Sequence, residues 1–331
     1  MEKFIASGFQ TKAIPHYNCG VMNRSHEEWQ ALGSKEPVLG YSMLAYGLVV
    51  EACYIPVLMA MLKRVRVNSC YRIMVVLGIF DMLAVCINSL ITGVLFLFGA
   101  NFCTNPDFIY VAGCWGMGLW CGACLLCLIL VINRLCDLWN NTLTETLFGG
   151  WKMHAWLFIP IIYTLYFAFF TPPILFDSSM SAWFLTPMIR RTDKEMQMFH
   201  NIPHTINNLT VVVVTCLLYV LLCIVLGHKY SSDSIHKVNR AQKMIMIQSV
   251  LICFASLIAS LIYVYMQFLP TPVWVILLGH FGWQLSHGIP AFVCLILNTT
   301  IRHEVVGYLG LRRYIKTGPT TNMTHSSTIH I

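Results

Sequence analysis

Charged residues are scarce in this chain, and they are nearly absent from seven long stretches of it. Asp, Glu, Lys and Arg together make up 11% of the 331 residues, whereas 57% are hydrophobic. The seven stretches contain only two carboxylates, Glu51 and Asp81. Because a soluble domain typically carries about 25% charged residues, this composition excludes an ordinary soluble fold.

Each of the seven stretches exceeds the roughly 20 apolar residues that a helix needs to cross a bilayer. Hydrocarbon offers no partner for backbone amides, so each span must satisfy its own hydrogen bonds as a helix. We therefore predict an all-α membrane protein with an N-terminal segment (1–38), a seven-transmembrane helix bundle (39–301), and a short amphipathic helix with a tail (302–331). The predicted spans are residues 39–62, 73–99, 108–132, 151–176, 205–227, 244–268 and 273–301.

Basic residues are missing from the second and sixth gaps between the spans. They concentrate in or beside the odd gaps and in the tail, at Lys63, Arg64, Arg66, Arg72, Arg134, Lys152, Lys229, Lys237, Arg240, Lys243, Arg302, Arg312, Arg313 and Lys316. Since cytoplasmic loops retain Lys and Arg, we expect a multi-pass protein of the plasma membrane with its N-terminus outside. These charges lie in short loops beside spans, which argues against nucleic-acid binding despite the net charge of +7.

Cysteine is missing from the long fourth gap, residues 177–204, which excludes a disulfide between that gap and the third span. Only Cys19 and Cys103 lie clearly on the predicted outer side. Their spacing leaves two alternatives open, a disulfide or two free thiols. Asn23 opens an Asn-Arg-Ser glycosylation sequon on the same side.

Several functional signatures are also missing. There is no metal-spaced His/Cys cluster, no phosphate-binding glycine loop and no Ser/His/Asp order, so we expect neither an enzyme nor a cofactor. The seventh span has no lysine, which excludes a retinal Schiff base. The third span has no charged residue, which disfavours a biogenic amine as ligand.

The two carboxylates within spans are candidates for internal roles. A charge within a membrane is costly and usually faces a partner inside the bundle, so Asp81 could belong to a polar switch. It could equally be a hydrogen-bonded tie between the second and seventh spans, and the two roles are compatible. Glu51 could accept a proton, meet His280 or His287, line a cavity, or simply be a packed acid.

The ends of the third and seventh spans carry further candidates for a switch. Arg134 follows Asn133 where the third span ends, and it could either snorkel to lipid headgroups or act in an activation motif. Asp137, about one turn on, is then its local counter-charge. In the seventh span, Pro290 frees a carbonyl and makes a kink that can serve as a hinge. The stretch 302–315 could lie along the inner surface as an amphipathic helix.

The outer half of the third span mixes small residues with aromatics, which suits a small, mostly apolar ligand. The rest of the predicted pocket supplies a few polar contacts, and Trp183 with Phe184 could form a lid. The alternative is that the aromatics serve helix packing and interfacial anchoring. The candidate ligand-pocket residues are Trp115, Met117, Trp120, Gln267, Trp283, Gln284 and His287.

An ordered set of short motifs resembles the nematode serpentine chemoreceptors of class T (Srt) over nearly the whole chain. One departure is Cys294, because the family has a tyrosine four residues after the last-span proline. The matching motifs include Tyr17-Asn-Cys19, Glu28-Trp29, Tyr54-Ile-Pro56, Cys70-Tyr-Arg-Ile-Met74, Asp81-Met82, Asn101-Phe-Cys103, Asn133-Arg134, Phe169-Phe-Thr-Pro-Pro173, Trp183-Phe184, Pro203-His204, Tyr263-Val-Tyr-Met-Gln-Phe268, Trp283-Gln284, His287-Gly-Ile-Pro-Ala291 and Asn298 to Arg302.

This resemblance implies a G-protein-coupled receptor (GPCR) that detects small environmental molecules in sensory neurons, in the ciliary membrane. Its expected partners are a small-molecule ligand, membrane lipids, and a heterotrimeric G protein that meets Arg134 and the loop around Lys237, Arg240 and Lys243. An oligomer with a second receptor is left open. Two other functions stay open. A seven-span ligand-gated cation channel would need the inverted topology, and a proton-coupled transporter would use Glu51 and Asp81.

Overall fold

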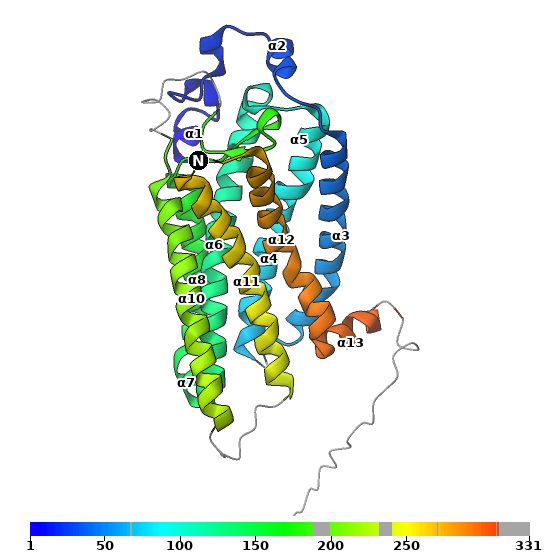
Figure 1. Ribbon diagram of the computed structural model, residues 1–331, viewed down its shortest axis with the longest axis vertical. Helices are drawn as coiled ribbons and strands as arrows, with labels where there is room; N and C mark the ends of the chain where they lie inside the picture. The colour runs from blue at the N-terminus through cyan, green and yellow to red at the C-terminus, as the bar shows by residue number, and fades with distance from the viewer. Residues whose placement is uncertain (67, 188–198, 232–239, 270, 309, 311–331) are drawn as a thin grey trace, which may run out of the picture.

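The structure is a computed structural model that describes residues 1–66, 68–187, 199–231, 240–269, 271–308 and 310. Long helices run side by side in one bundle (Figure 1). They are α3 (Pro37–Leu62), α4 (Ser69–Val85) continued by η3 (Cys86–Ile91) and α5 (Thr92–Phe98), α6 (Pro106–Trp139), α8 (Lys152–Phe170), α10 (Ile202–Ser231), α11 (Arg240–Phe268) and α12 (Val273–Leu297). The described residues contain six spans long and apolar enough to cross a membrane, and α12 qualifies together with the helix after it. The predicted seven-helix bundle is confirmed.

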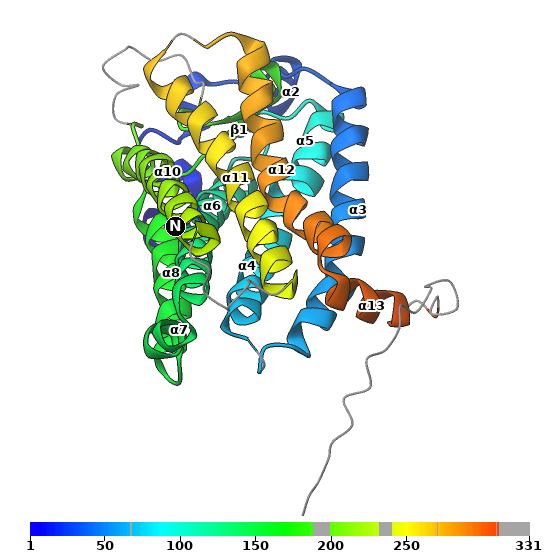
Figure 2. The same cartoon turned by 60° about the horizontal axis from the view of Figure 1, so that its bottom comes forward.

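The last span ends earlier than the predicted boundary at residue 301. The chain bends by 91° between α12 and α13 (Thr299–Tyr308), so α13 turns away from the bundle (Figure 2). The cause is Asn298, which has extended backbone angles and accepts a hydrogen bond from the Ile301 amide through its side chain. This is helix N-capping, which starts a new helix at Thr299 rather than at the predicted residue 302.

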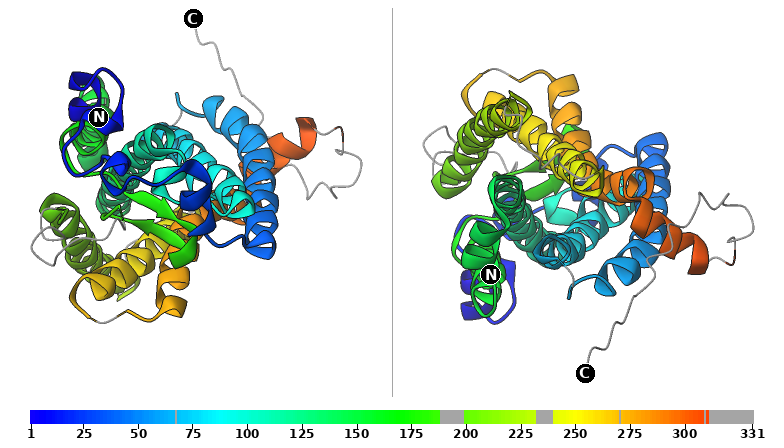
Figure 3. Two further views of the ribbon diagram at one scale, coloured as in Figure 1. Left: turned by 90° about the horizontal axis from the view of Figure 1, so that it is seen from above. Right: turned by 90° about the horizontal axis from the view of Figure 1, so that it is seen from below.

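Helix α6 lies at the centre of the bundle (Figure 3). Of its most apolar 18-residue window, 83% is buried, against 22% for α10. Glycines let α8 approach it closely: a Cβ at Gly118 would lie 2.6 Å from the Thr164 carbonyl oxygen. The helix continues beyond the predicted end at residue 132, because Asn133, Arg134 and Asp137 remain helical up to Trp139. The predicted switch residues of the third span therefore lie on a regular helix.

The N-terminal segment and a hairpin cover one end of the bundle, called here the N-terminal end (Figures 1 and 3). The segment contains α1 (Glu2–Ala6), η1 (Thr11–Ala13), η2 (Cys19–Met22) and α2 (His26–Ala31), and the hairpin pairs β1 (Leu175–Asp177) with β2 (Ala182–Phe184) around η5 (Ser178–Met180). A disulfide joins Cys19 to Cys103, which lies in η4 (Phe102–Thr104). Of the two alternatives left by the sequence, the structure has the bridge. Asn23, next to η2, is exposed.

The opposite end of the bundle, called here the α13 end, carries α7 (Asn141–Phe148) and α13. Lys63 and Arg64, just after α3, pair with Glu304 of α13 at 3.3 and 3.2 Å. These contacts attach α13 to the first span. Of the predicted G-protein loop, Lys237 lies outside the described residues, and only the backbone is described for Arg240.

Candidate functional site

A cavity lies beneath the hairpin, and about 50 Å³ of it is accessible to a water-sized sphere. Three of the predicted pocket residues, Met117, Trp120 and Trp283, line it, whereas the other four are not among its lining residues. The cavity is lined by residues of α6, α10, α11 and α12 with the hairpin: Gly116, Met117, Trp120, Ile174, Ala182, Trp183, His204, Tyr263, Met266, Ile276, His280 and Trp283.

A π-helical turn in the second span shapes one side of this region. The turn, η3, leaves the Asn88 carbonyl for partners on another helix. The Thr92 hydroxyl donates to the Ile87 carbonyl at 2.8 Å. His280 Nε2 and Gln284 Nε2 of α12 approach the Asn88 carbonyl at 3.1 and 2.8 Å. The predicted ligand contact Gln284 is thus directed at the second span.

The hairpin closes the cavity from the N-terminal end. Trp183 of β2 lines the cavity, and its Nε1 donates to the Thr92 hydroxyl at 2.9 Å. The approach to the hairpin depends on Gly113, because a Cβ there would lie 1.6 Å from the Ile174 carbonyl oxygen. Trp183 therefore has the position expected of a lid, while Phe184 is not among the lining residues.

A second polar network borders the cavity on the α10 side. Trp120 Nε1 donates to Asn208 Oδ1 at 3.0 Å, and Asn208 Nδ2 lies 3.3 Å from His204 Nε2. The other ring nitrogen of His204 lies 3.5 Å from Gln267 Nε2. Gln267 thus reaches the cavity wall only through His204. Sequence reasoning named neither His204 nor Asn208 as a site residue. Asn208 lies inside an apolar span, which is the signal that singled out Asp81, whereas His204 lies just before the predicted start of its span at residue 205.

Directly beyond Trp120 lies a buried cluster of Tyr54, Asp81 and His287, one from each of α3, α4 and α12. His287 Nδ1 is 2.7 Å from Asp81 Oδ1, and the Tyr54 hydroxyl donates to Asp81 Oδ2 at 2.6 Å. The tie between the second and seventh spans therefore exists, and it includes the first span as well. The Trp120 and His287 rings lie 6.0 Å apart, edge to face, so His287 contacts the cavity through Trp120.

Glu51 takes no part in this cluster. Its described partner is the Cys86 thiol, at 3.7 Å, while His280 and His287 contact the Asn88 carbonyl and Asp81 instead. Of the alternatives for Glu51, a contact with either histidine is not found among the described residues, because both rings have partners in the second span.

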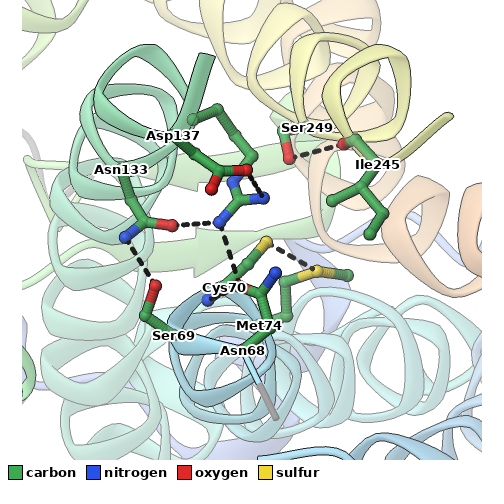
Figure 4. Close-up of polar contacts among 9 residues, drawn as sticks. Asn68, Ser69, Cys70, Met74, Asn133, Asp137, Ile245 and Ser249 are labelled. Carbon is green, nitrogen blue, oxygen red and sulfur yellow. Dashed lines mark hydrogen bonds and ion pairs between the residues drawn. The ribbon is translucent and has the colours of Figure 1, made fainter. Parts of the chain in front are cut away.

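Near the α13 end, Arg134 is held by neighbours from α6 and α4. Its guanidinium pairs with Asp137 at 3.2 Å, contacts Asn68 Oδ1 at 3.2 Å and donates to the Asn133 side chain. Asn133 in turn donates to the Ser69 hydroxyl at 2.9 Å (Figure 4). Arg134 is only 4% exposed, which contradicts the snorkelling interpretation and confirms Asp137 as its counter-charge.

A third buried network connects α11 and α12 with α4. Gln248 Nε2 lies 2.9 Å from Cys294 Sγ, and the Asn298 amide donates to Gln248 Oε1 at 3.2 Å and to the Tyr71 hydroxyl at 3.1 Å. Cys294, the departure from the family pattern, is thus the partner of Gln248. This pairing could not be predicted, because Gln248 and Cys294 lie 46 residues apart along the chain.

Comparisons with known proteins agree with this architecture. The chain is similar to squid rhodopsin in structure, with a TM-score of 0.59 at 10% identity over 87% of this chain and 90% of that one, which supports the fold alone. It is 27% identical over 300 residues to Serpentine receptor class T-55 of Caenorhabditis elegans, covering 90% of this chain and 81% of the relative. The model of the family described as "Serpentine type 7TM GPCR chemoreceptor Srt" matches residues 4–317. The chain therefore belongs to the Srt family of serpentine seven-transmembrane GPCR chemoreceptors.

Proposed function

We propose that this receptor binds a small uncharged molecule in the cavity beneath the hairpin and activates a heterotrimeric G protein at the α13 end. The observation that carries the proposal is the spatial order of the sites within one bundle. The cavity touches Trp120, Trp120 touches the Asp81 cluster, and Arg134 lies farther along the same helix as Trp120. Among the described lining residues there is no Asp, Glu, Lys or Arg, which favours an uncharged ligand.

The buried clusters suggest how ligand binding could change the α13 end. A ligand shifts a conformational equilibrium only if it binds one state more tightly than the other. A ligand against Trp120 and Trp283 contacts both α6 and α12, and Pro290 lies on α12 between the cavity and the Gln248 network. Motion about Pro290 would then loosen the contacts of Gln248 with α12 and let α11 move away from Arg134.

The proposed orientation places the N-terminal end outside the cell and Arg134 inside, as the distribution of basic residues predicts. In this orientation the exposed Asn23 is available to glycosylation, and Arg134 and the start of α11 with Lys243 lie on the side of the G protein. Family membership supports the ciliary membrane of sensory neurons as the site of action. An oligomer with a second receptor is compatible with this arrangement.

The test is G-protein activation by the full chain in a cell that expresses it at a measured surface level. We expect the Arg134→Ala variant to lose activation, because the buried guanidinium becomes the contact for the G protein when its neighbours release it. Arg24→Ala is the matched control: Arg24 lies at the N-terminal end against the Trp29 ring, and the variant should signal normally. Normal activation by Arg134→Ala at equal surface level would refute the proposed role of this residue.

A further inference from the structure

We infer that the cavity selects ligands that carry a hydroxyl group, an inference that rests on the proposed role of this cavity as the ligand site. Two side chains of α12, His280 and Trp283, line the cavity three residues apart. Each is only 3% exposed, and their rings are 5.9 Å apart and perpendicular. Each ring carries one atom that could hydrogen-bond to a ligand: Nδ1 of His280 and Nε1 of Trp283.

His280 offers an acceptor. Its Nε2 lies 3.1 Å from the carbonyl oxygen of Asn88, and a carbonyl oxygen can only accept, so Nε2 carries the hydrogen. In a neutral imidazole the other nitrogen, Nδ1, then has a free lone pair. None of the hydrogen bonds found among the described residues uses this atom. The ring is therefore fixed by the second span on one side and can accept a hydrogen bond on the other.

Trp283 offers a donor. Its Nε1 is buried and has no hydrogen-bond partner among the described residues. Trp120 and Trp183, the other two tryptophans of the lining, donate to Asn208 and Thr92. Since leaving a buried N–H unpaired is unfavourable, Trp283 has more to gain from a ligand acceptor than either of them.

A hydroxyl group pairs with both atoms, because it donates one hydrogen bond and accepts others. A ketone, an aldehyde or an ether only accepts, so it would leave His280 Nδ1 without a partner. A carboxylate or an ammonium would bring a charge into a lining without a counter-charge. The remaining lining is mostly aromatic, aliphatic or sulfur-containing, including Met117, Ile276 and Tyr263, which suits an aryl or alkyl skeleton on the hydroxyl.

The experiment measures binding to the purified full chain in lipid nanodiscs, without G protein, as the ligand-dependent rise of the unfolding temperature. The probes form matched sets: benzyl alcohol, benzaldehyde, benzyl methyl ether and toluene, together with the corresponding cyclohexyl compounds. We expect the alcohol of each set to bind about fivefold or more tightly than its aldehyde, ether and hydrocarbon partners, as expected for one or two neutral hydrogen bonds.

The Trp283→Phe variant keeps the aromatic ring but removes the donor. Alcohols, aldehydes and ethers all accept hydrogen bonds, so each should lose affinity relative to its hydrocarbon partner, while the alcohol keeps its preference over the aldehyde and the ether through His280 Nδ1. Trp274→Phe is the matched control, because Trp274 lies on the same helix, is 67% exposed and does not line the cavity. This control should keep the affinities of the unmodified chain.

Equal binding of alcohols and ethers by the unmodified chain would overturn the inference, as would the absence of binding by every alcohol of the sets. A separate assay of nucleotide exchange on G protein distinguishes this failure from failure of the proposed function. Alcohol binding without exchange would refute the receptor mechanism and leave the ligand class intact. Nucleotide exchange driven by the aldehydes or ethers but not by the alcohols would refute the ligand class and leave the receptor mechanism intact.

Discussion

The two buried clusters that contain Asp81 and Arg134 differ in how their side chains are paired. Asp81 pairs with His287, 206 residues away in sequence, and the Tyr54 hydroxyl links both to α3. Arg134 instead pairs with Asp137 of its own helix, and only neutral groups, Asn68 and the Asn133–Ser69 pair, join this cluster to α4. The Asp81 cluster thus holds three helices together, while the Arg134 cluster holds a side chain in place.

This difference indicates that the two clusters have different roles, one in stability and the other in signalling. Losing the acid of a buried hydrogen-bonded cluster is costly, because its partners are left without it in the interior. Arg134 is buried too, but without the Asp137 charge its guanidinium still contacts Asn68 and Asn133, so the loss there should be smaller. We therefore expect changes at Asp81 to act mainly on stability and changes around Arg134 to act mainly on signalling.

The largest expected effect comes from Asp81→Ala. It leaves His287 and Tyr54 without their shared partner in the interior, so we expect a loss of about 3–5 kcal/mol in the free energy of unfolding. Denaturant unfolding of the purified chain measures this loss. Asp81→Asn keeps the size and an acceptor oxygen and should lose clearly less. Equal stability of the alanine variant and the unmodified chain would contradict the claim that the Asp81 cluster holds three helices together.

Tyr54→Phe should have an intermediate effect. The hydroxyl lies 2.6 Å from Asp81 Oδ2 and 2.9 Å from the His287 carbonyl, so its removal leaves a buried acceptor short of a donor. We expect a loss of about 1–3 kcal/mol in unfolding free energy. Tyr41→Phe on the same helix is the control, because Tyr41 is 66% exposed and should lose almost nothing. Equal losses in both variants would show that the hydroxyl of Tyr54 does not tie the helices.

Asp137→Asn should destabilise the chain clearly less than Asp81→Ala, because the Arg134 guanidinium keeps its contacts with Asn68 and Asn133. It removes the charge that restrains the Arg134 guanidinium, so we expect higher ligand-independent nucleotide exchange on G protein. Glu145→Gln is the control, since Glu145 is an exposed acid of α7 at the same end. If Asp137→Asn left basal nucleotide exchange unchanged but caused a large loss of stability, the Arg134 cluster would serve stability and not signalling, contrary to the proposal.

The smallest effect concerns the exposed pairs that attach α13. Hydrogen bonding and charge from Lys63, with a contribution from Arg64, hold the pKa of Glu304 below its usual 4.5. A depressed folded-state pKa stabilises the attachment above the unfolded pKa, and this stabilisation is lost as pH falls through the folded value. A spin-label distance between α13 and α3 should therefore grow slightly below about pH 4. In Glu304→Gln it should not depend on pH in that range, and an identical pH response in both chains would contradict the assignment.

Much of the fold could be predicted because a long stretch of apolar residues is enough to identify a membrane-spanning helix. The seven apolar stretches correspond to the helices, and a charge at Asp81 required an inward partner. Asp137 could be assigned to Arg134 because both lie within one turn of one helix. In each case the physical cause acts over a short stretch of sequence.

The rest depends on contacts between distant segments. No feature of the sequence Cys86–Ile91 predicts a π-helical turn. Yet the Asn88 carbonyl in this turn is the hydrogen-bond partner of His280 Nε2. The pocket prediction placed Gln284 and His287 on the correct helix, but the partners that turn them away from the cavity come from the second span. The boundary at Asn298 was missed because an asparagine within an apolar run can cap a helix or simply be buried.

The central claim is that the cavity end faces outward and the Arg134 end faces the cytoplasm, and mapping of glycosylation tests it most directly. The full chain would be expressed in cells, and removal of a glycan by glycosidase would be compared with that in Asn23→Gln and Asn322→Gln variants. Asn23 is exposed beside η2, whereas Asn322 lies outside the described residues. The account predicts a glycan at Asn23 and none at Asn322. A glycan at Asn322 would place the Arg134 end outside, contradict coupling to a G protein and favour an ion channel of inverted topology.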